Sequence, residues 1–246
     1  MVPFKFMVFL PKSGKYKPID DVLEDEEYKT LSGTELRQLL DKGKGIPEWF
    51  TFKSVARELE LSNPPLIKRG LTIFFTGLSG SGKSTLANGL VTRLLEQGSR
   101  PVTLLDGDIV RTHLSSELGF SKEHRSINVK RIGYVASEIT KNRGIAICAP
   151  IAPYESDRNF NKELISQYGG YIEVFVSTPL DICEERDSKG LYALARKGVI
   201  KEFTGISDPY EQPENPDIII DSSEEDPKIL IEKIINKIKS LGYMNE

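Results

Sequence analysis

The sequence predicts an α/β protein: a parallel sheet covered by helices on both faces. Two observations lead to this prediction. After residue 70, short and uninterrupted apolar runs alternate with helical patterns, and such runs are typical of parallel strands that are buried on both sides. A glycine-rich loop also joins the first apolar run to the first helical pattern. With 39% hydrophobic residues, the chain can form a sizeable core without metal or disulfide support.

The elements of this region follow one another in regular order. Strands are expected over residues 71–76, 101–105, 145–150, 171–176 and 217–220. A helix is expected over 83–97. A closing helix presents one apolar face formed by Ile229, Leu230, Ile234, Ile235 and Ile238.

Residues 1–60 form a different segment. The spacing of Ser32 and Glu35 predicts a capping box that starts one short helix ending at Gly43. Pro64 and Pro65 follow and prevent a helix from continuing. We therefore expect a small N-terminal appendage over 1–60 and the main domain over 61–246.

Composition excludes several classes of protein. The 33 basic and 36 acidic residues give a net charge of −3, which argues against a general nucleic-acid or membrane-surface binder. No apolar run approaches the roughly 20 residues of a membrane span, and no signal-peptide pattern follows the start. With only two cysteines, Cys148 and Cys183, both expected as buried thiols, the chain is interpreted as a reduced cytoplasmic protein.

The glycine-rich loop fits the pattern Gly-x-x-x-x-Gly-Lys-Ser/Thr, with a strand before it and a helix after it. It consists of Gly77, Leu78, Ser79, Gly80, Ser81, Gly82, Lys83 and Ser84, followed by Thr85. In such a P-loop the backbone N–H groups surround phosphate oxygens, the lysine reaches the β- and γ-phosphates, and the serine hydroxyl binds Mg²⁺. The sequence thus predicts a P-loop NTPase-type domain that binds ATP with Mg²⁺.

Two carboxylates follow the second expected strand, at Asp106 and Asp108. Ligands of open parallel sheets bind beyond the carboxyl ends of the strands, so both side chains should face the P-loop. An aspartate there can bind Mg²⁺ or accept the proton of an attacking hydroxyl. We predict Lys83, Asp106 and Asp108 as catalytic residues, and Ser84 and Asp106 as metal ligands.

Two basic stretches remain open from the residues alone. Arg111, Arg125 and Arg131 surround Phe120, which suits either a bound base with anionic groups or a solvated helix face with Phe120 in the core. The segment 186–201 is also basic and is either a charged surface helix or an element that closes over phosphates. His113 and His124 belong to no nucleophile motif and are expected at the surface.

Several segments together resemble the adenylylsulfate kinase family, whose members phosphorylate adenosine 5′-phosphosulfate (APS) at its 3′-hydroxyl to give PAPS. The segments are GLSGSGKST, LDGDIVR, LGFS, NVKRIGYVA, PIAPYESDR, IEVFVSTPLDICEERDSKGLYALAR and FTGISDPYEQPENPDI, in order over about residues 70–222. The resemblance implies that Arg186 lies against the ATP adenine and that Phe120 stacks on the APS adenine. It also implies an APS site formed by Arg111, Phe120, Arg125, Asn128, Ile151, Lys189, Phe203, Thr204 and Gly205, with Ile206 beside it.

The chain departs from the family pattern at some positions. His124, Ile127 and Lys130 stand where many members have Asp, Glu and Arg, and Ala152 stands where some bacterial members have a serine that can be phosphorylated. LSGTELRQLL and GIPEWFTFKSV in the first sixty residues resemble the C-terminal end of the catalytic region of ATP sulfurylase. The nucleotide-binding motifs of that enzyme are absent, so we do not expect the chain itself to make APS.

Three functional hypotheses follow. The first is an APS kinase that uses Mg·ATP, cooperates with an ATP sulfurylase and forms a homo-oligomer. The second is a non-catalytic nucleotide-binding module that regulates a fused sulfurylase. The third, a P-loop kinase for another small hydroxyl compound, agrees less well with LGFS and FTGISDPYE. The intact Lys83, Asp106 and Asp108 favour the first.

Overall fold

The computed structural model describes residues 5–98, 100–187 and 189–245. The chain divides into two compact units, residues 1–68 and 69–246. Each is described by itself below. The boundary expected between residues 60 and 61 stays a prediction.

The N-terminal unit contains a hairpin and two helices. Its elements are β1 (Met7–Leu10), β2 (Lys15–Pro18), the 3-10 helix η1 (Ile19–Asp21), α1 (Gly33–Asp41) and α2 (Lys53–Ser62), with η2 (Leu66–Lys68) at its end. Ser32 Oγ accepts from the Glu35 N–H while the Glu35 carboxylate accepts from the Ser32 N–H, so the predicted capping box starts α1. Stacked rings of Phe9 and Trp49, with centroids 5.5 Å apart, join the hairpin to the segment before α2.

The larger unit alternates strands and helices. Its strands are β3 (Leu71–Thr76), β4 (Val102–Asp106), β5 (Ile145–Ala149), β6 (Gly170–Val176) and β7 (Ile218–Ile220). Its helices are α3 (Lys83–Gln97), α4 (Gly107–His113), α5 (Lys122–Lys141), α6 (Glu155–Ser166), α7 (Leu180–Arg186), α8 (Leu191–Arg196) and α9 (Pro227–Ser240).

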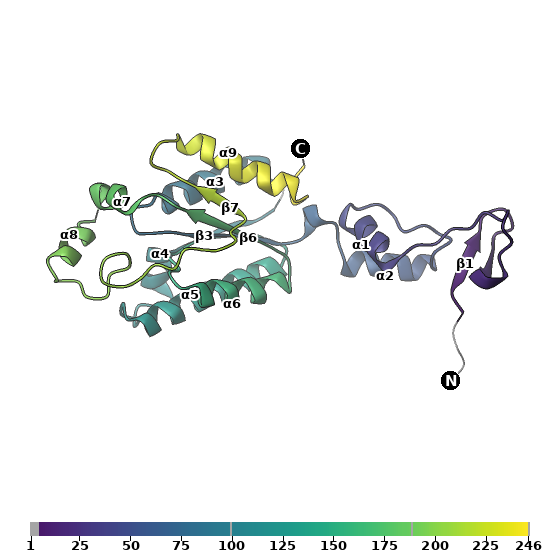
Figure 1. Ribbon diagram of the computed structural model, residues 1–246, viewed down its shortest axis with the longest axis horizontal. Coiled ribbons are helices and arrows are strands. Elements are labelled where there is room, and N and C mark those ends of the chain that lie inside the picture. The colour runs from purple at the N-terminus through teal and green to yellow at the C-terminus, as the bar shows by residue number, and fades with distance from the viewer. Residues whose placement is uncertain (1–4, 99, 188, 246) are drawn as a thin grey trace. The chain divides into compact units, whose positions relative to one another are not determined.

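The five strands form one parallel sheet in the order β4-β5-β3-β6-β7. Helices α3 and α9 lie over one face and α5 and α6 over the other (Figure 1). Every residue of β3 is buried, which explains why its sequence does not alternate between apolar and charged residues. The predicted α/β class with helices on both faces is confirmed.

The core is split by the sheet into two apolar layers. On one face, side chains of α3 such as Leu86 and Leu90 pack with Ile234 and Ile235 of α9. On the other, Ile132 and Ala136 of α5 pack against β3 and β5. This close packing fixes the ends of the strands, from which the loops of the site emerge.

The sequence missed part of the N-terminal unit. One short helix was expected in residues 1–60, whereas the structure adds the β1–β2 hairpin and α2. Both hairpin strands are only four residues long, and α2 has no side-chain cap at Phe52. The local signals for strand and helix are therefore weak there. Among the described helices, none is both long and apolar enough to cross a bilayer.

Candidate active site

A cleft of about 760 Å³ lies at the carboxyl edge of the sheet, where the segments after β3, β4 and β5 converge. This is the edge at which open α/β sheets bind ligands. Most of the predicted site residues line it: Ser79, Gly80, Gly82, Lys83, Ser84, Thr85, Asp106, Asp108, Arg111, Phe120, Arg125, Asn128, Ile151, Arg186, Lys189, Phe203 and Thr204.

The P-loop connects β3 to α3 through a backbone that requires glycine. Gly77, Gly80 and Gly82 have φ values of 148°, 74° and 97°. A Cβ at Gly77 would lie 2.5 Å from the Val176 carbonyl oxygen, so no larger residue fits there. The loop ends at the N-terminus of α3, whose first N–H groups and helix dipole favour a bound anion.

Lys83 is the first residue of α3 and is almost fully buried. Its ammonium donates to the Leu78 carbonyl oxygen at 2.6 Å. Burial lowers the pKa of Lys83 to about 8, while the nearby Cys183, Asp106 and Asp108 act in the opposite direction. Negative charge from phosphate oxygens would strengthen the protonated form, because opposite charges nearby favour the charged state.

Asp106 lies at the end of β4 and is 8% exposed. Its Oδ1 accepts from the Asp108 N–H at 3.0 Å and so caps α4, while its Oδ2 accepts from the Ser84 hydroxyl at 2.7 Å. The carboxylate is therefore held in place from both sides and directed at the P-loop.

The Ser84 hydroxyl and the Asp106 carboxylate form a donor set that fits Mg²⁺. Both are hard oxygen ligands, and they already touch each other. In the part of the chain that the structure describes, no three His, Cys, Asp or Glu side chains gather into a metal cluster. Mg²⁺ here would complete its shell with phosphate oxygens and water, as is usual in sites that bind nucleotide phosphates.

Asp108 differs from Asp106 in its surroundings. Its side chain is exposed and forms an ion pair with Lys189. Lys189 lies between α7 and α8, in the basic segment that the sequence singled out. The pair links this segment to the β4–α4 corner across the mouth of the cleft.

Phe120 is not part of the core. Its ring is 61% exposed, and the Arg111 guanidinium lies over it at 4.4 Å from the centroid. This excludes the alternative in which the basic residues form a solvated helix face and Phe120 packs in the core. An exposed ring beside a cation offers one free face for a flat ligand.

Arg125 connects α5 to the loop after α8 by hydrogen bonds. Its guanidinium donates to the Asp208 carboxylate at 2.7 Å and also contacts Thr204 Oγ1 and the Glu202 carbonyl. Tyr154 donates its hydroxyl to the same Asp208 oxygen at 2.7 Å. Burial and the Asp208 carboxylate raise the pKa of Tyr154, which keeps the phenol protonated as a donor.

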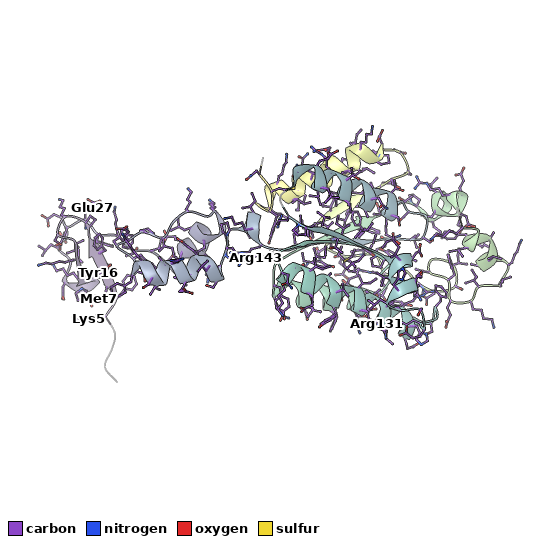
Figure 2. The ribbon with its side chains drawn as sticks, turned by 180° about the vertical axis from the view of Figure 1, so that it is seen from behind. Lys5, Met7, Tyr16, Glu27, Arg131 and Arg143 are labelled. Atoms are coloured by element: carbon purple, nitrogen blue, oxygen red, sulfur yellow. The ribbon has the colours of Figure 1, made fainter. Side chains whose placement is uncertain are left out.

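Arg131 of the same helix has a different role. It donates to the Glu117 carboxylate at 2.5 Å and to the Leu114 carbonyl oxygen at 3.0 Å. Figure 2 labels it on the face of the larger unit. Arg131 does not line the cleft, so the basic stretch divides into cleft residues and surface residues.

The wall of the cleft after β5 is a strained turn at Ala152, whose φ is 47°. Thr76 Oγ1 donates to the Ile151 carbonyl oxygen at 2.7 Å, and Arg158 donates to that of Ala152 at 2.9 Å. Arg158 is itself buried in an ion pair with Glu173 at 3.1 Å. Among the described residues, the buried side-chain oxygen Oδ1 of Asn128 is one of several polar atoms without a hydrogen-bond partner.

Arg186 ends α7 at the P-loop. Its guanidinium donates to the Ser222 hydroxyl at 2.9 Å and to the Ser222 carbonyl at 2.7 Å. Ser222 Oγ in turn donates to the Ser81 carbonyl oxygen at 2.7 Å. These bonds attach the guanidinium to the loop that is expected to hold the phosphates.

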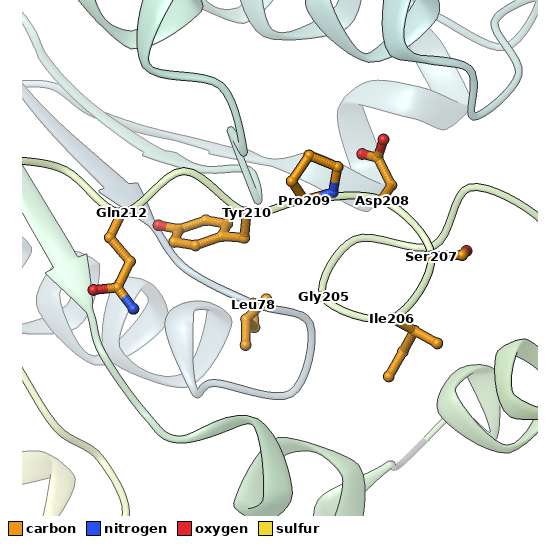
Figure 3. A pocket seen from close by; sticks show the side chains of 8 residues that line it. All are labelled: Leu78, Gly205, Ile206, Ser207, Asp208, Pro209, Tyr210 and Gln212. Atoms are coloured by element: carbon orange, nitrogen blue, oxygen red, sulfur yellow. The ribbon is translucent and has the colours of Figure 1, made fainter.

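Four predicted residues lie outside the main cleft. Gly77 and Ser81 are buried inside the P-loop. Leu78 and Gly205 instead line a second, shallower hollow of about 530 Å³ with Ile206, Ser207, Asp208, Pro209, Tyr210 and Gln212. Figure 3 shows Leu78 across from the turn that carries Ile206 and Ser207.

Sequence reasoning missed Tyr154, Arg158, Asp208 and Ser222, which hold predicted site residues in place. Asp208 and Tyr154 lie within two of the quoted segments, but their contacts span 83 and 54 residues respectively. His113 is exposed as expected, whereas His124 is half-buried and accepts the Gly119 N–H at 2.8 Å.

Two family models match the chain. The family model described as adenylylsulphate kinase matches residues 69–221. The chain belongs to the adenylylsulphate kinase family. A second model, ATP-sulfurylase, matches residues 1–61. The resemblance inferred from the sequence is thus confirmed for both parts of the chain.

Curated relatives align with this chain over its whole length. A protein named sulfate adenylyltransferase from Phaeosphaeria nodorum is 46% identical over 246 residues, which are all of this chain and 43% of that protein. One of the same name from Aspergillus terreus is 47% identical with the same coverage. The chain thus spans less than half the length of the curated relatives it matches.

Two solved structures resemble the chain closely. The hexameric APS kinase from Thiobacillus denitrificans has a TM-score of 0.82 and 44% identity, covering 98% of this chain and 43% of that one. The Mycobacterium tuberculosis APS kinase CysC, in complex with AMPPNP and APS, has a TM-score of 0.67 and 38% identity. It covers 70% of this chain and 98% of that one. Both structural similarities agree with the family of the chain.

Proposed function

We propose that this chain transfers the γ-phosphoryl group of ATP to the 3′-hydroxyl of APS, giving ADP and PAPS. One observation carries the proposal: the P-loop with Lys83, the carboxylate of Asp106 and the acceptor-side residues Arg111, Phe120 and Arg125 all line a single cleft. Two nucleotides bound in one cleft is the arrangement that direct transfer needs.

On the donor side, the P-loop binds the phosphates and Arg186 the base of ATP. The Lys83 ammonium leaves the Leu78 carbonyl and binds phosphate oxygens, since both interactions are within the reach of one side chain. Ser84 and Asp106, together with phosphate oxygens, would hold Mg²⁺, and the ion would supply positive charge against that of the phosphates. Electrostatic stabilisation of this kind supplies most of the catalysis in phosphoryl transfer.

On the acceptor side, Phe120 stacks on the adenine of APS, and Arg111 and Arg125 bind its anionic groups. Asn128 and Ile151 line the same wall, and the unpartnered Asn128 oxygen is available to a donor group of the ligand. Phe203 and Thr204 complete the site through the loop that Arg125 holds. Gly205 follows them in the chain but lines the second hollow, so its contact with APS stays a prediction.

At the reacting atoms, Asp106 orients the 3′-hydroxyl and accepts its proton as the bond to phosphorus forms. The carboxylate is fixed by two hydrogen bonds, so it needs no reorganisation at that moment. Asp108 assists through its pair with Lys189, which holds the α7–α8 segment over the cleft. Closure of such a segment excludes water and favours transfer over hydrolysis.

The partners of this function are part of the proposal. APS is the product of ATP sulfurylase, and residues 1–61 match the model of that family, so we propose a sulfurylase as the functional partner. We also propose a homo-oligomer, since the similar kinase of Thiobacillus denitrificans is described as hexameric. A cytoplasmic location fits substrates that are cellular nucleotides.

The decisive experiment incubates the protein with ATP, Mg²⁺ and APS and measures ADP and PAPS by anion-exchange chromatography. We expect stoichiometric formation of both, and none without APS. ATP binding without PAPS formation would instead support the non-catalytic regulatory module. Formation of ADP with another small alcohol but not with APS would support a different kinase.

Lys83→Ala is the matched control for this assay. We expect kcat to fall by about 10²–10³, because the ammonium acts on charge that develops during transfer. The fold should persist, which circular dichroism and thermal melting can check. A kcat above about a tenth of the wild-type value would contradict the role given to Lys83.

A further inference from the structure

The segment Leu118–Phe120, between α4 and α5, lies outside the core. Leu118 is half-buried and Gly119 is exposed. The Phe120 ring is 61% exposed and contacts the Arg111 guanidinium at 4.4 Å. Burial in the core therefore does not fix the ring, and its position depends on the backbone that carries it.

Two side chains hold that backbone from opposite elements. Arg111 of α4 donates to the carbonyl oxygens of Leu118 and Gly119, at 3.2 and 2.9 Å. His124 of α5 accepts the Gly119 N–H through Nδ1 at 2.8 Å. The peptide groups on both sides of Gly119 are therefore hydrogen-bonded, directly before the aromatic residue.

His124 is well placed for this contact. It lies in the first turn of α5, where its own N–H donates to the helix cap Ser121 Oγ at 3.3 Å. Its ring thus lies beside the segment that enters the helix. At Gly119 a Cβ would lie 3.3 Å from Nδ1, so the absence of a side chain leaves room for the imidazole. Nδ1 accepts as part of a neutral imidazole that carries its proton on Nε2.

We propose that His124 is a positioning residue for Phe120. Its Nδ1 fixes the Gly119 peptide and thereby holds the aromatic ring in the place where the acceptor nucleotide stacks. Arg111 contacts both backbone and ring, whereas the side chain of His124 bonds to the backbone and would act on the ligand through Phe120. This inference rests on the proposed function, because it takes Phe120 as the surface that receives the base of APS.

The covalent geometry of the side chain provides a sharp set of variants. The Oδ1 of asparagine or aspartate is bonded to Cγ, as Nδ1 is in histidine, so His124→Asn and His124→Asp keep an acceptor at the same place. His124→Leu keeps the size but removes the acceptor. His113→Leu is the matched control, since His113 is an exposed histidine of α4.

The experiment measures kcat and the KM for APS and for ATP in each variant, with a titration calorimetry measurement of APS binding and a thermal melt. For His124→Leu we expect the KM and Kd for APS to rise about 3- to 10-fold, as befits one lost hydrogen bond. The KM for ATP and kcat at saturation should stay within about twofold. His124→Asn, His124→Asp and His113→Leu should stay close to the wild type.

Each other outcome overturns the proposal. Unchanged APS binding in His124→Leu would show that the bond does not position the ring. Failure of both His124→Asn and His124→Asp to restore APS binding would show that acceptance by the side chain is not its role. Equal losses for APS and ATP with a lower melting temperature would indicate a purely structural residue. A wild-type protein that makes no PAPS would instead disprove the proposed function first, and the inference with it.

Discussion

At the scale of single residues, the backbone of Ala152 is unusual because a non-glycine residue there has a φ of 47°. Left-handed backbone conformations cost an L-residue about 1–2 kcal/mol. Hydrogen bonds from Thr76 to the Ile151 and Ala152 carbonyls, and from Arg158 to that of Ala152, hold the turn in this conformation. The strained residue therefore lies in the wall of the cleft, and the hydrogen bonds from Thr76 and Arg158 offset the cost of its conformation.

The substitution Ala152→Gly tests this strain. Glycine removes the cost of the left-handed conformation but adds about 0.5–1 kcal/mol of entropy to the unfolded chain. We expect the free energy of unfolding to stay constant or rise by up to about 1 kcal/mol. Ala136→Gly, in the middle of α5, should instead lower it by roughly 1 kcal/mol or more. Urea denaturation measures both, and a clear loss of stability in Ala152→Gly would contradict the expected strain.

The positions of the P-loop and of Asp106 at the cleft could be predicted because the spacing of these residues is local. The P-loop is contiguous, and Asp106 follows a strand whose end the apolar pattern defines. The contacts of Asp208 and Arg158 could not be predicted. Asp208 pairs with Arg125 and Arg158 pairs with Glu173, and both pairs depend on how separate elements pack. Nor does a sequence show that Phe120 stays exposed.

At the scale of elements, β5 and α7 each contain one buried cysteine. Burial raises the pKa of the Cys148 thiol and that of Cys183, although Lys83 and Arg186 act in the opposite direction on Cys183. A thiol attacks only as its thiolate. Neither cysteine therefore has the chemistry of a nucleophile in this fold.

The reaction with Ellman's reagent at pH 8 tests this burial. We expect no rapid release of thionitrobenzoate from the native protein, and two equivalents after unfolding in guanidinium chloride, in accord with its two cysteines. Protection should hold at pH 8 because a raised pKa keeps a thiol protonated above its usual range. Fast labelling of one equivalent in the native state would mean that β5 or α7 opens locally.

The elements of the larger unit followed closely from the sequence pattern. The strand over 71–76 and the helix over 83–97 have the observed bounds, and the other strands differ by one residue at one end or, for β4, at both. These elements bury their apolar sides, so the apolar positions in the sequence are the positions that pack in the core. The β1–β2 hairpin is different, since Lys15 and Tyr16 are exposed and no apolar pattern marks that strand.

At the scale of the whole molecule, the two compact units differ in the residues that they contribute to the proposed site. The residues assigned to phosphate, metal and acceptor all belong to residues 69–246. We therefore expect a protein that starts near Ser62 to keep most of the kinase activity of the full chain. PAPS formation by the two proteins at equal concentration measures this. Loss of kcat in a truncated protein with an unchanged melting profile would show that the N-terminal unit takes part in the chemistry.

The kinetic mechanism is a second property of the whole molecule. Ala152 has no hydroxyl to accept a phosphoryl group, and the proposed function assigns the P-loop hydroxyls to phosphate and Mg²⁺ binding. We expect direct transfer with sequential kinetics, in which both nucleotides bind before either product leaves. Intersecting lines in a double-reciprocal analysis, and no stable label from γ-labelled ATP without APS, check this. Label that APS could chase into PAPS would contradict it.

The strand order β4-β5-β3-β6-β7 places the phosphate-binding loop after the central strand. β3 pairs along its whole length with β6 and over four residues with β5, so its amide groups exchange with solvent only when the sheet itself opens. The short helices α7 and α8 belong to no such ladder and can open at a much smaller cost in free energy. We therefore expect nucleotides to enter and leave by local unfolding of α7 and α8, while β3, which carries the P-loop, opens only with the fold as a whole.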